Sequence, residues 1–346
     1  MTVGGPRHDI AAKRLRNVLR AHVVASDRIL EQKISDAGPT NQRIDPHILT
    51  EARQKLVFEG AIIQVQRSNV PWYHLASADA EAVKNRLSEL EALHRQTRRP
   101  QFTVLLGQML EIAVFRALQS QTLLEYFGHF RDLDAHDDSK PYSKEEPPSW
   151  LSGREIPNKK KLDFLIRHPE HGYAGIEIKN IRQWMYPDRD EVRELLFKCC
   201  SQDVVPVLIC RRIHYSTFSV LNPCGVILHQ SFNQLYPKSE QALAEKVKHK
   251  LLLGYHDVRV GNEPDARLIR FIHHNLPQVL PTARQRFERF KDLLWGYANG
   301  DHSYKSFAAR VKRRLHGEPE DLPPFEEPQA PEPPEDFDEM PDDGYE

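Results

Sequence analysis

Three charged residues interrupt an apolar segment near the middle of this 346-residue chain. The segment KKKLDFLIRHPEHGYAGIEIKN, residues 159–180, contains Asp163, Glu177 and Lys179. Alternation along a strand places Glu177 and Lys179 on the same face, and Asp163 belongs to the preceding strand of the expected hairpin. A charge inside a core costs several kcal/mol unless it is paired or binds a metal, so these three charges require a partner.

Two neighbouring carboxylates repel each other, and a bound cation would keep both of them ionised. Mg²⁺ prefers oxygen ligands and commonly takes one or two carboxylates while it keeps several waters. A metal-bound water next to Lys179 is suited to attack a phosphodiester, because the metal stabilises charge on the phosphate and eases deprotonation of the water. The spacing therefore predicts an Mg²⁺ site, with Mn²⁺ as a substitute, that acts on phosphodiester bonds.

The surrounding pattern predicts the elements that position these residues. An apolar segment, FTVLLGQMLEIAVFRALQS, predicts a central helix with Glu111 in its middle. Next come a possible strand, a polar proline-rich insertion, the two strands of the hairpin, a second helix and two buried strands. These elements are expected at residues 123–130, 132–150, 162–168, 173–179, 189–202, 204–212 and 224–230.

Asp163, the sequence Glu177-Ile178-Lys179, Glu111 and the order of elements together resemble the PD-(D/E)XK nuclease superfamily. The resemblance implies the restriction-endonuclease-like fold, an α/β fold with a mixed central sheet flanked by helices. It implies that Asp163 and Glu177 bind Mg²⁺ together with the backbone carbonyl of Ile178. It further implies that Lys179 orients or activates the attacking water and that Glu111 supports the metal site.

The match covers roughly residues 102–236, and it departs from the family at Leu162, where proline is frequent but variable. Glu-x-Lys alone is a weak signal, and the chain contains a second copy at Glu31-Gln32-Lys33. That copy lies in a helix-like stretch without an apolar strand around it. Only the pair at Glu177 has the expected context. A surface hairpin with a salt bridge, or a nuclease-like fold without activity, remains the alternative interpretation.

The first 76 residues show three helical patterns followed by two alternating segments, AIIQV and VPWYHL. This order resembles a winged helix domain. The resemblance implies that the third helix, expected from Asp45 to Gly60, enters the major groove of DNA. Its solvent face is expected to carry four DNA-contacting residues, Thr50, Arg53, Gln54 and Lys55. A winged helix that binds protein or packs on its neighbour is the alternative.

The rest of the chain divides by composition. Residues 77–100 predict a helical linker between the winged helix domain (1–76) and the nuclease domain (101–236). Residues 237–317 predict a C-terminal helical region, and the pattern does not decide whether it is a third domain or a cap on the second. Residues 318–346, rich in proline and acidic side chains, predict a disordered tail.

The balance of 48 Lys+Arg against 49 Asp+Glu conceals a strong asymmetry. Residues 318–346 contain 13 acidic residues and no Lys or Arg, which leaves 48 basic against 36 acidic residues in positions 1–317. A basic body with an acidic tail indicates a polyanionic partner such as DNA. The tail would compete for the same surface or would only keep a basic protein soluble.

The four cysteines show no C-x-x-C spacing, which argues against a zinc ribbon or a disulfide framework. With no signal-peptide pattern and no apolar run of membrane-spanning length, a soluble cytoplasmic protein is expected.

Together these patterns predict an Mg²⁺-dependent DNA endonuclease, similar to modular restriction enzymes and bacterial defence nucleases. Arg182 and Gln183, just after the catalytic strand, are expected to contact the phosphate backbone. A double-strand break would require a homodimer or two successive cuts, and a partner ATPase or methyltransferase is left open. A repair nuclease or Holliday junction resolvase is the main rival, and a catalytically silent binding module is the alternative from another class.

Overall fold

A computed structural model describes residues 6–36, 43–131, 133 and 138–320. The chain forms two compact units. The first consists of Met1–Thr103 and Glu240–Arg259, and the second of Val104–Ser239 and Val260–Glu346. The region predicted to form one C-terminal helical part is therefore divided between the two units. The predicted tail lies outside the described residues from position 321 onward, as do five residues of the polar insertion.

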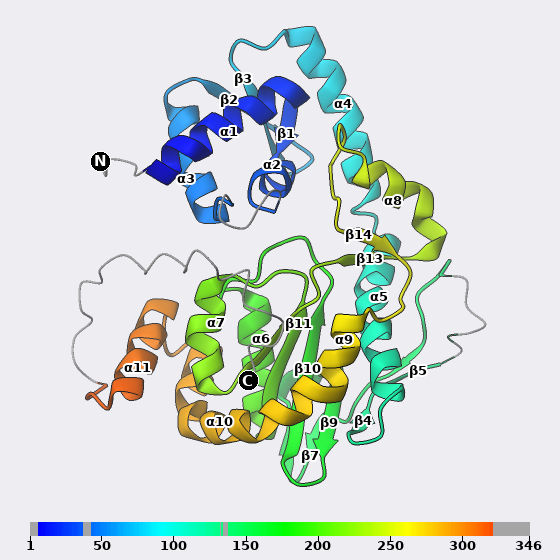
Figure 1. The fold of residues 1–346 in the computed structure, drawn as a ribbon, viewed down its shortest axis with the longest axis vertical. Coiled ribbons are helices and arrows are strands. Elements are labelled where there is room, and N and C mark those ends of the chain that lie inside the picture. Colours follow the sequence, from blue (N-terminus) through cyan, green and yellow to red (C-terminus); the bar gives the residue numbers. More distant parts are fainter. Residues whose placement is uncertain (1–5, 37–42, 132, 134–137, 321–346) are drawn as a thin grey trace. The chain divides into compact units, whose positions relative to one another are not determined.

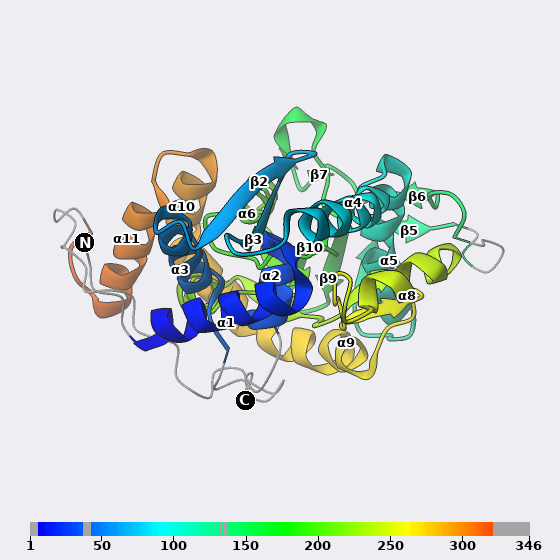
Figure 2. The ribbon, with the colours of Figure 1, turned by 90° about the horizontal axis from the view of Figure 1, so that it is seen from above.

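The first unit begins with three helices and a three-stranded antiparallel sheet in the order β1-β3-β2. Figure 2 shows the three helices with β2 and β3. Its two-residue hairpin turn, Ser68-Asn69, has positive φ at both positions, the conformation that matches the twist of the flanking strands. The short strand β1 was not predicted. The elements are α1 (Pro6–His22), β1 (Val24–Ser26), α2 (Asp27–Ile34), α3 (Pro46–Phe58), β2 (Ile62–Arg67) and β3 (Val70–Leu75).

The segment predicted as a linker is helix α4 (Ala80–Gln96), and it belongs to the first unit. Asp79 caps its first turn by accepting a hydrogen bond from the Ala82 amide at 2.8 Å. The helix buries one apolar face, as its periodicity predicts. That face consists of Val83, Leu87, Leu90 and Leu93. The segment Glu240–Arg259 adds two further elements to the first unit. They are α8 (Gln241–Lys248) and most of β14 (Val258–Val260).

The second unit is built on a mixed five-stranded sheet in the order β12-β11-β10-β9-β4 (Figure 1). Strands β4, β9 and β10 run antiparallel, whereas β10, β11 and β12 run parallel. The predicted mixed α/β class is confirmed at this level. The strands are β4 (Glu125–Phe127), β9 (Phe164–His168), β10 (Gly172–Lys179), β11 (Val205–Cys210) and β12 (Ile227–Gln230).

Helices connect and cover this sheet. Helix α6 provides the crossover between parallel β10 and β11, and α10 packs on α6 and beside β11 and β12. The helices are α5 (Pro100–Gln119), α6 (Asp190–Gln202), α7 (Tyr215–Leu221), α9 (Ala266–Arg270), α10 (Leu276–Asn299) and α11 (Tyr304–His316). Short helical turns occur at η3 (Pro157–Lys159), η4 (Asn222–Cys224), η5 (Lys238–Glu240) and the π-helix η6 (Phe271–Asn275).

Helix α5 is the one helix of the described residues that is long and apolar enough to cross a membrane by length and composition. The expectation that no segment reaches this length is therefore corrected. Met109, Ile112 and Ala113 are fully buried in the core of the second unit. A buried core helix can have the length and composition of a membrane span, so this helix is weak evidence for one.

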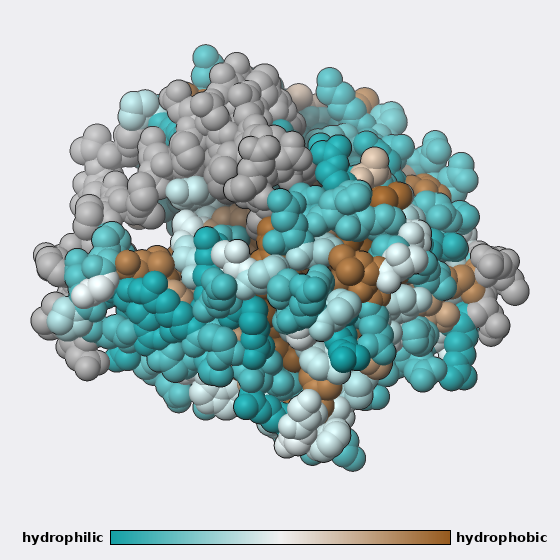
Figure 3. Space-filling model, turned by 60° about the horizontal axis from the view of Figure 1, so that its bottom comes forward, coloured by the Kyte–Doolittle hydropathy of each residue, from teal (hydrophilic) through white to brown (hydrophobic). Residues whose placement is uncertain are grey.

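The insertion predicted as a surface loop, residues 132–150, contributes β6 and the first residue of β7 to two short antiparallel ladders. They consist of β5 (His129–Phe130) with β6 (Lys144–Glu145), and β7 (Trp150–Leu151) with β8 (Arg154–Glu155). One more short strand, β13 (Gln234–Tyr236), follows β12. Hydrophilic side chains cover most of the coloured surface in Figure 3, and hydrophobic ones form separate patches.

Candidate active site

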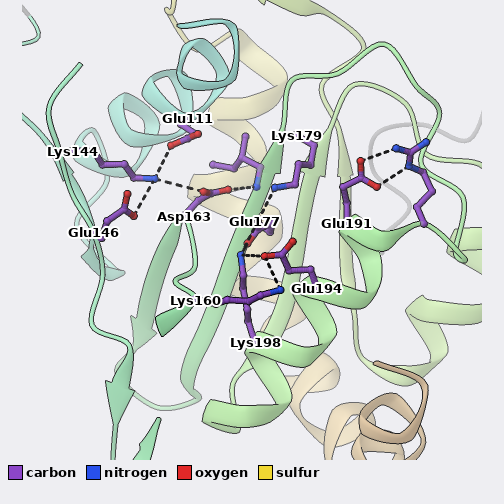
Figure 4. Close-up of polar contacts among 12 residues, drawn as sticks. Glu111, Lys144, Glu146, Lys160, Asp163, Glu177, Lys179, Glu191, Glu194 and Lys198 are labelled. Carbon is purple, nitrogen blue, oxygen red and sulfur yellow. Dashed lines mark hydrogen bonds and ion pairs between the residues drawn. The ribbon is translucent and has the colours of Figure 1, made fainter. Parts of the chain in front are cut away.

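The structure brings Asp163 together with Glu177 and Lys179 of β10 (Figure 4). Asp163 directly precedes β9, and its amide donates to the Ile176 carbonyl of β10 at 3.1 Å. Its Oδ2 accepts a hydrogen bond from the Ile178 amide at 2.6 Å. Because β9 and β10 are adjacent and antiparallel, the Asp163 carboxylate is fixed to the backbone between Glu177 and Lys179.

Glu177 is buried and is paired with two ammonium groups. Its Oε1 accepts from Lys179 Nζ at 2.6 Å, and Lys198 Nζ lies 3.1 Å from Oε1 and 2.9 Å from Oε2. Burial and the charge of Asp163 raise the pKa of Glu177 above its usual value, and both lysines act against this rise. Lys198 is on α6, so this helix covers the face of β10 that carries Glu177.

The pKa of Asp163 is raised to about 6, first by burial and then by the charge of Glu111. Lys144, Lys179 and the Ile178 amide lower it. For Lys179, burial lowers the pKa, but the attraction of Glu177, Asp163 and Glu194 and the hydrogen bond to Glu177 together outweigh burial and leave the pKa raised. The carboxylates and ammonium groups therefore depend on one another for their charge.

Glu111 reaches this cluster through Lys144 of β6. Lys144 Nζ lies 2.6 Å from Glu111 Oε2, 3.6 Å from Asp163 Oδ1 and 3.7 Å from Glu146 Oε2 (Figure 4). The ammonium group also lies over the ring of Phe164, 4.9 Å from its centroid. The predicted helix glutamate thus lies at the site, and a lysine stands between it and Asp163.

Lys144 and Lys198 are the two site residues that sequence reasoning missed. Lys198 could have been identified from the sequence, because it is a charged residue on the apolar face of α6. Its buried neighbours there are Leu195, Leu196 and Cys199. The sequence gives no such indication for Lys144, because it belongs to a polar insertion in which a lysine is expected.

The donor chemistry of this cluster fits a hard divalent cation. Burial is the first cause of the raised pKa values of Asp163 and Glu177, and nearby carboxylates add to it. A cation between the two groups would favour their ionised forms. With the Ile178 carbonyl they form an oxygen set of the kind that Mg²⁺ accepts. Lysines provide this compensation in the present arrangement. Within the described residues, no group of three or more His, Cys, Asp or Glu is placed to hold a metal ion.

The residues that follow β10 are held by neighbouring elements, among them α5 and β13. Asn180 is buried, and its side-chain amide donates to the Leu106 carbonyl at 2.5 Å and to the Leu235 carbonyl at 2.7 Å. Arg182 and Gln183, predicted to contact DNA, are both half-buried. Arg182 also accepts a hydrogen bond at its carbonyl from Arg211 at 2.6 Å.

On α3 the four predicted DNA-contacting residues differ in exposure. Gln54 and Lys55 are exposed, and Thr50 is half-buried with its hydroxyl donating to the Pro46 carbonyl at 2.9 Å. The placement of Arg53 on the solvent face is wrong, because its residue exposure is 7%.

Arg53 points inward because it has partners there. Its Nη1 lies 2.7 Å from Asp27 Oδ1, and its guanidinium group lies over the ring of Tyr73 at 4.9 Å. The residue therefore connects α3, α2 and β3 inside the first unit and is not presented to a ligand.

Comparisons with protein-family models, with curated proteins and with solved structures found no match for this chain.

Proposed function

We propose that this chain is a divalent-metal-dependent nuclease that hydrolyses phosphodiester bonds in DNA. The observation that carries the proposal is the position of Asp163 beside Glu177 and Lys179 on adjacent strands of a mixed sheet. Helix α6 forms the crossover connection between the parallel strands β10 and β11. Glu111 of α5 lies at the edge of the same cluster, where it pairs with Lys144. This arrangement of helices, strands and acids supports the proposed resemblance to the restriction-endonuclease-like fold.

Each residue has a distinct part in the proposal. Asp163, Glu177 and the Ile178 carbonyl would hold Mg²⁺ or Mn²⁺, which when bound stabilises charge on the phosphate and eases deprotonation of water. Lys179 can meet the substrate, since 24% of its side chain is exposed. Lys198 is 6% exposed at its side chain, so it acts by positioning Glu177.

DNA is the proposed substrate for two reasons. The chain up to Gly317 has an excess of basic residues, which attracts a polyanion. The helices and the β2/β3 hairpin of the first unit follow the order of a winged helix domain, and Gln54 and Lys55 are exposed on α3.

Cleavage of supercoiled plasmid in Mg²⁺ or Mn²⁺ tests the proposal. The variants Asp163→Asn and Lys179→Met should reduce nicking by at least about 100-fold, as for loss of a group that acts on the reacting atoms. EDTA should abolish nicking. Lys160→Met is the matched control, because Lys160 lies 3.5 Å from Glu194 Oε1 at the edge of the cluster and is 43% exposed. Equal activity of all variants would exclude this site.

The same assay separates the rival substrates. A four-way junction cut in preference to linear duplex would indicate a junction resolvase or repair nuclease, and cleavage of an RNA transcript alone would replace DNA as substrate. Linearisation without a nicked intermediate would indicate that two copies of the chain act together.

A catalytically silent binding module is the second candidate, and one observation favours it. The carboxylates of Asp163 and Glu177 already have ammonium partners in Lys144, Lys179 and Lys198. A module of this kind would bind DNA equally well in EDTA and after Lys179→Met. Retention in a gel shift without cleavage under any metal condition would favour it.

A further inference from the structure

Four basic side chains from four separate segments of the first unit lie close enough to act on one another electrostatically. His22 ends α1, Lys33 is on α2, Arg86 is on α4, and Lys250 follows α8. None of them belongs to α3, the predicted DNA-contacting helix. Lys33 is also the lysine of the second Glu-x-Lys sequence, which the candidate active site does not use.

Lys33 is held against the turn that follows α8. Its Nζ donates to the Lys250 carbonyl at 2.7 Å. Gly254 closes the turn with φ of +70°, and a Cβ at this position would lie 2.7 Å from Lys33 Nζ. The turn is fixed by the amides of Leu252 and Gly254, which donate to the His249 carbonyl at 2.9 and 3.2 Å. The ammonium group is therefore fixed in place by backbone.

The charges that act on Lys33 are all positive. Burial lowers its pKa to about 8, and Lys250 and Arg86 lower it further in the same direction. For His22, burial lowers the pKa to about 4, assisted by Lys33 and Arg86. Arg86 has one carboxylate partner, Glu89, at 2.5 Å, and 18% of the Arg86 side chain is exposed.

This arrangement is costly without an anion. Bringing like charges together and partly removing them from water disfavours the charged forms. Within the described part of the chain, donors of Lys33 also remain unused, because an ammonium group has three N–H bonds and Lys33 gives one of them to a carbonyl. Nδ1 of His22 is buried without a hydrogen-bond partner in the described structure, and it can donate to an anion once the ring is protonated. Lys250 is exposed, so the cluster can be reached from solvent.

We propose that His22, Lys33, Arg86 and Lys250 form a binding site for a phosphate group. A phosphate offers several acceptor oxygens and at least one negative charge, which matches several converging donors and balances their excess charge. A lysine ammonium group binds phosphate as a compact charge, and an arginine guanidinium group can donate two parallel hydrogen bonds to it. The group belongs to a nucleic-acid backbone or to a free phosphate compound.

Binding of duplex DNA by the full chain in EDTA, measured between 50 and 200 mM salt, tests the first source. Lys33→Met and Lys250→Met should each weaken binding about tenfold and reduce the salt slope by about 1. Lys84→Met, which removes an exposed charge from α4, is the matched control and should have little effect. Because no cleavage is measured, the result is independent of the proposed nuclease activity.

Thermal unfolding with inorganic phosphate or pyrophosphate tests the second source. Either ion should raise the melting temperature of the wild type and not that of Lys33→Met. Lys250→Met provides a second variant, since its exposed side chain is not needed for folding. If the variants change only the response to the free ions, the site binds a phosphate compound. If the variants weaken DNA binding, the site binds the phosphate backbone of DNA. Wild-type behaviour of both variants in both assays, or an equal effect of Lys84→Met, would overturn the proposal.

Discussion

Single residues decide the chemistry of the candidate active site through their charge partners. Glu177 is 2% exposed and is compensated by Lys179 on its own strand and by Lys198 on α6. The two lysines differ in access to solvent, so one can meet a substrate and the other holds the carboxylate. Burying such a cluster costs desolvation energy that good geometry must offset, which makes it weak evidence for stability and stronger evidence for function.

Lys144→Met should raise the pKa of Asp163 further above about 6. The Lys144 ammonium lowers this pKa by charge attraction at 3.6 Å, and its loss leaves burial and Glu111 less opposed. Carbon-detected NMR titration of aspartate-labelled, metal-free protein measures the change. Lys160→Met, which removes a partner of Glu194, should leave the titration of Asp163 unchanged. An unaltered titration in Lys144→Met would show that this lysine does not approach Asp163 in solution.

At the scale of elements, a close backbone contact positions helix α10 against the turn that precedes β12. Gly225 lies two residues before β12 with φ of +86°, and a Cβ there would lie 2.3 Å from the Ala283 carbonyl oxygen and 2.4 Å from the Phe287 amide nitrogen of α10. Both contacts are with backbone, which cannot move aside as a flexible side chain can. Glycine is therefore required where α10 crosses this turn.

Gly225→Ala should destabilise the second unit by about 3 kcal/mol or more, from steric overlap and from the positive φ together. Gly107→Ala is the matched control, since Gly107 is in α5 and a Cβ would meet nothing within 4 Å. That substitution should stabilise the helix by about 0.5–1 kcal/mol. Urea unfolding of both variants measures the difference, and equal stabilities would show that α10 does not dock against Gly225.

The stability of the β12 region should fall as the pH is lowered from 7 to 5. Burial and then Arg267 lower the pKa of His229 to about 3, and its ring stacks on Phe271 with centroids 4.1 Å apart. Below pH 6.5 the unfolded chain binds a proton that the folded chain does not, so folding loses about 2 kcal/mol by pH 5. The loss begins at the unfolded pKa and continues until the pH reaches about 3.

His229→Phe keeps an aromatic ring against Phe271 and removes the titration. Urea unfolding at pH 7 and pH 5 should therefore show a smaller loss of stability in this variant than in the wild type. An equal loss in both proteins would mean that other groups cause the acid sensitivity.

For the whole molecule, the distribution of charge matters more than the net charge. The sum is close to neutral, yet 13 acidic residues follow Gly317 and the preceding chain has an excess of basic residues. The start of this acidic stretch is tied to α11, since Glu320 Oε2 accepts from Arg314 Nη2 at 2.9 Å.

Removing residues 321–346 should strengthen DNA binding at low salt, because these acidic side chains compete with phosphate for basic surface. A second truncation after Gly317 also removes Glu320, one of the two carboxylate partners that Arg314 has among the described residues, and should add to the effect. Fluorescence anisotropy with a labelled duplex measures both. The gain should shrink as salt screens the charges, and equal affinity of all three proteins at low salt would exclude competition by the tail.

Local sequence patterns determined most of the elements of this protein. Pro46 and Gly60 mark the limits of α3, and the spacing of Val83, Leu87, Leu90 and Leu93 predicts the buried face of α4. These signals are local because helix and strand periodicity and capping depend on residues close in sequence. For the same reason, alternation along β10 was sufficient to place Glu177 and Lys179 on one face.

Only the tertiary structure decided which distant residues meet. Lys144 lies between Glu111 and Asp163, Lys198 reaches Glu177 from α6, and Arg53 turns inward to Asp27. It also divided residues 237–317 between two units and joined Lys250 to Lys33. The energies of such contacts depend on burial and on partners far apart in the chain, so neither periodicity nor composition contains them.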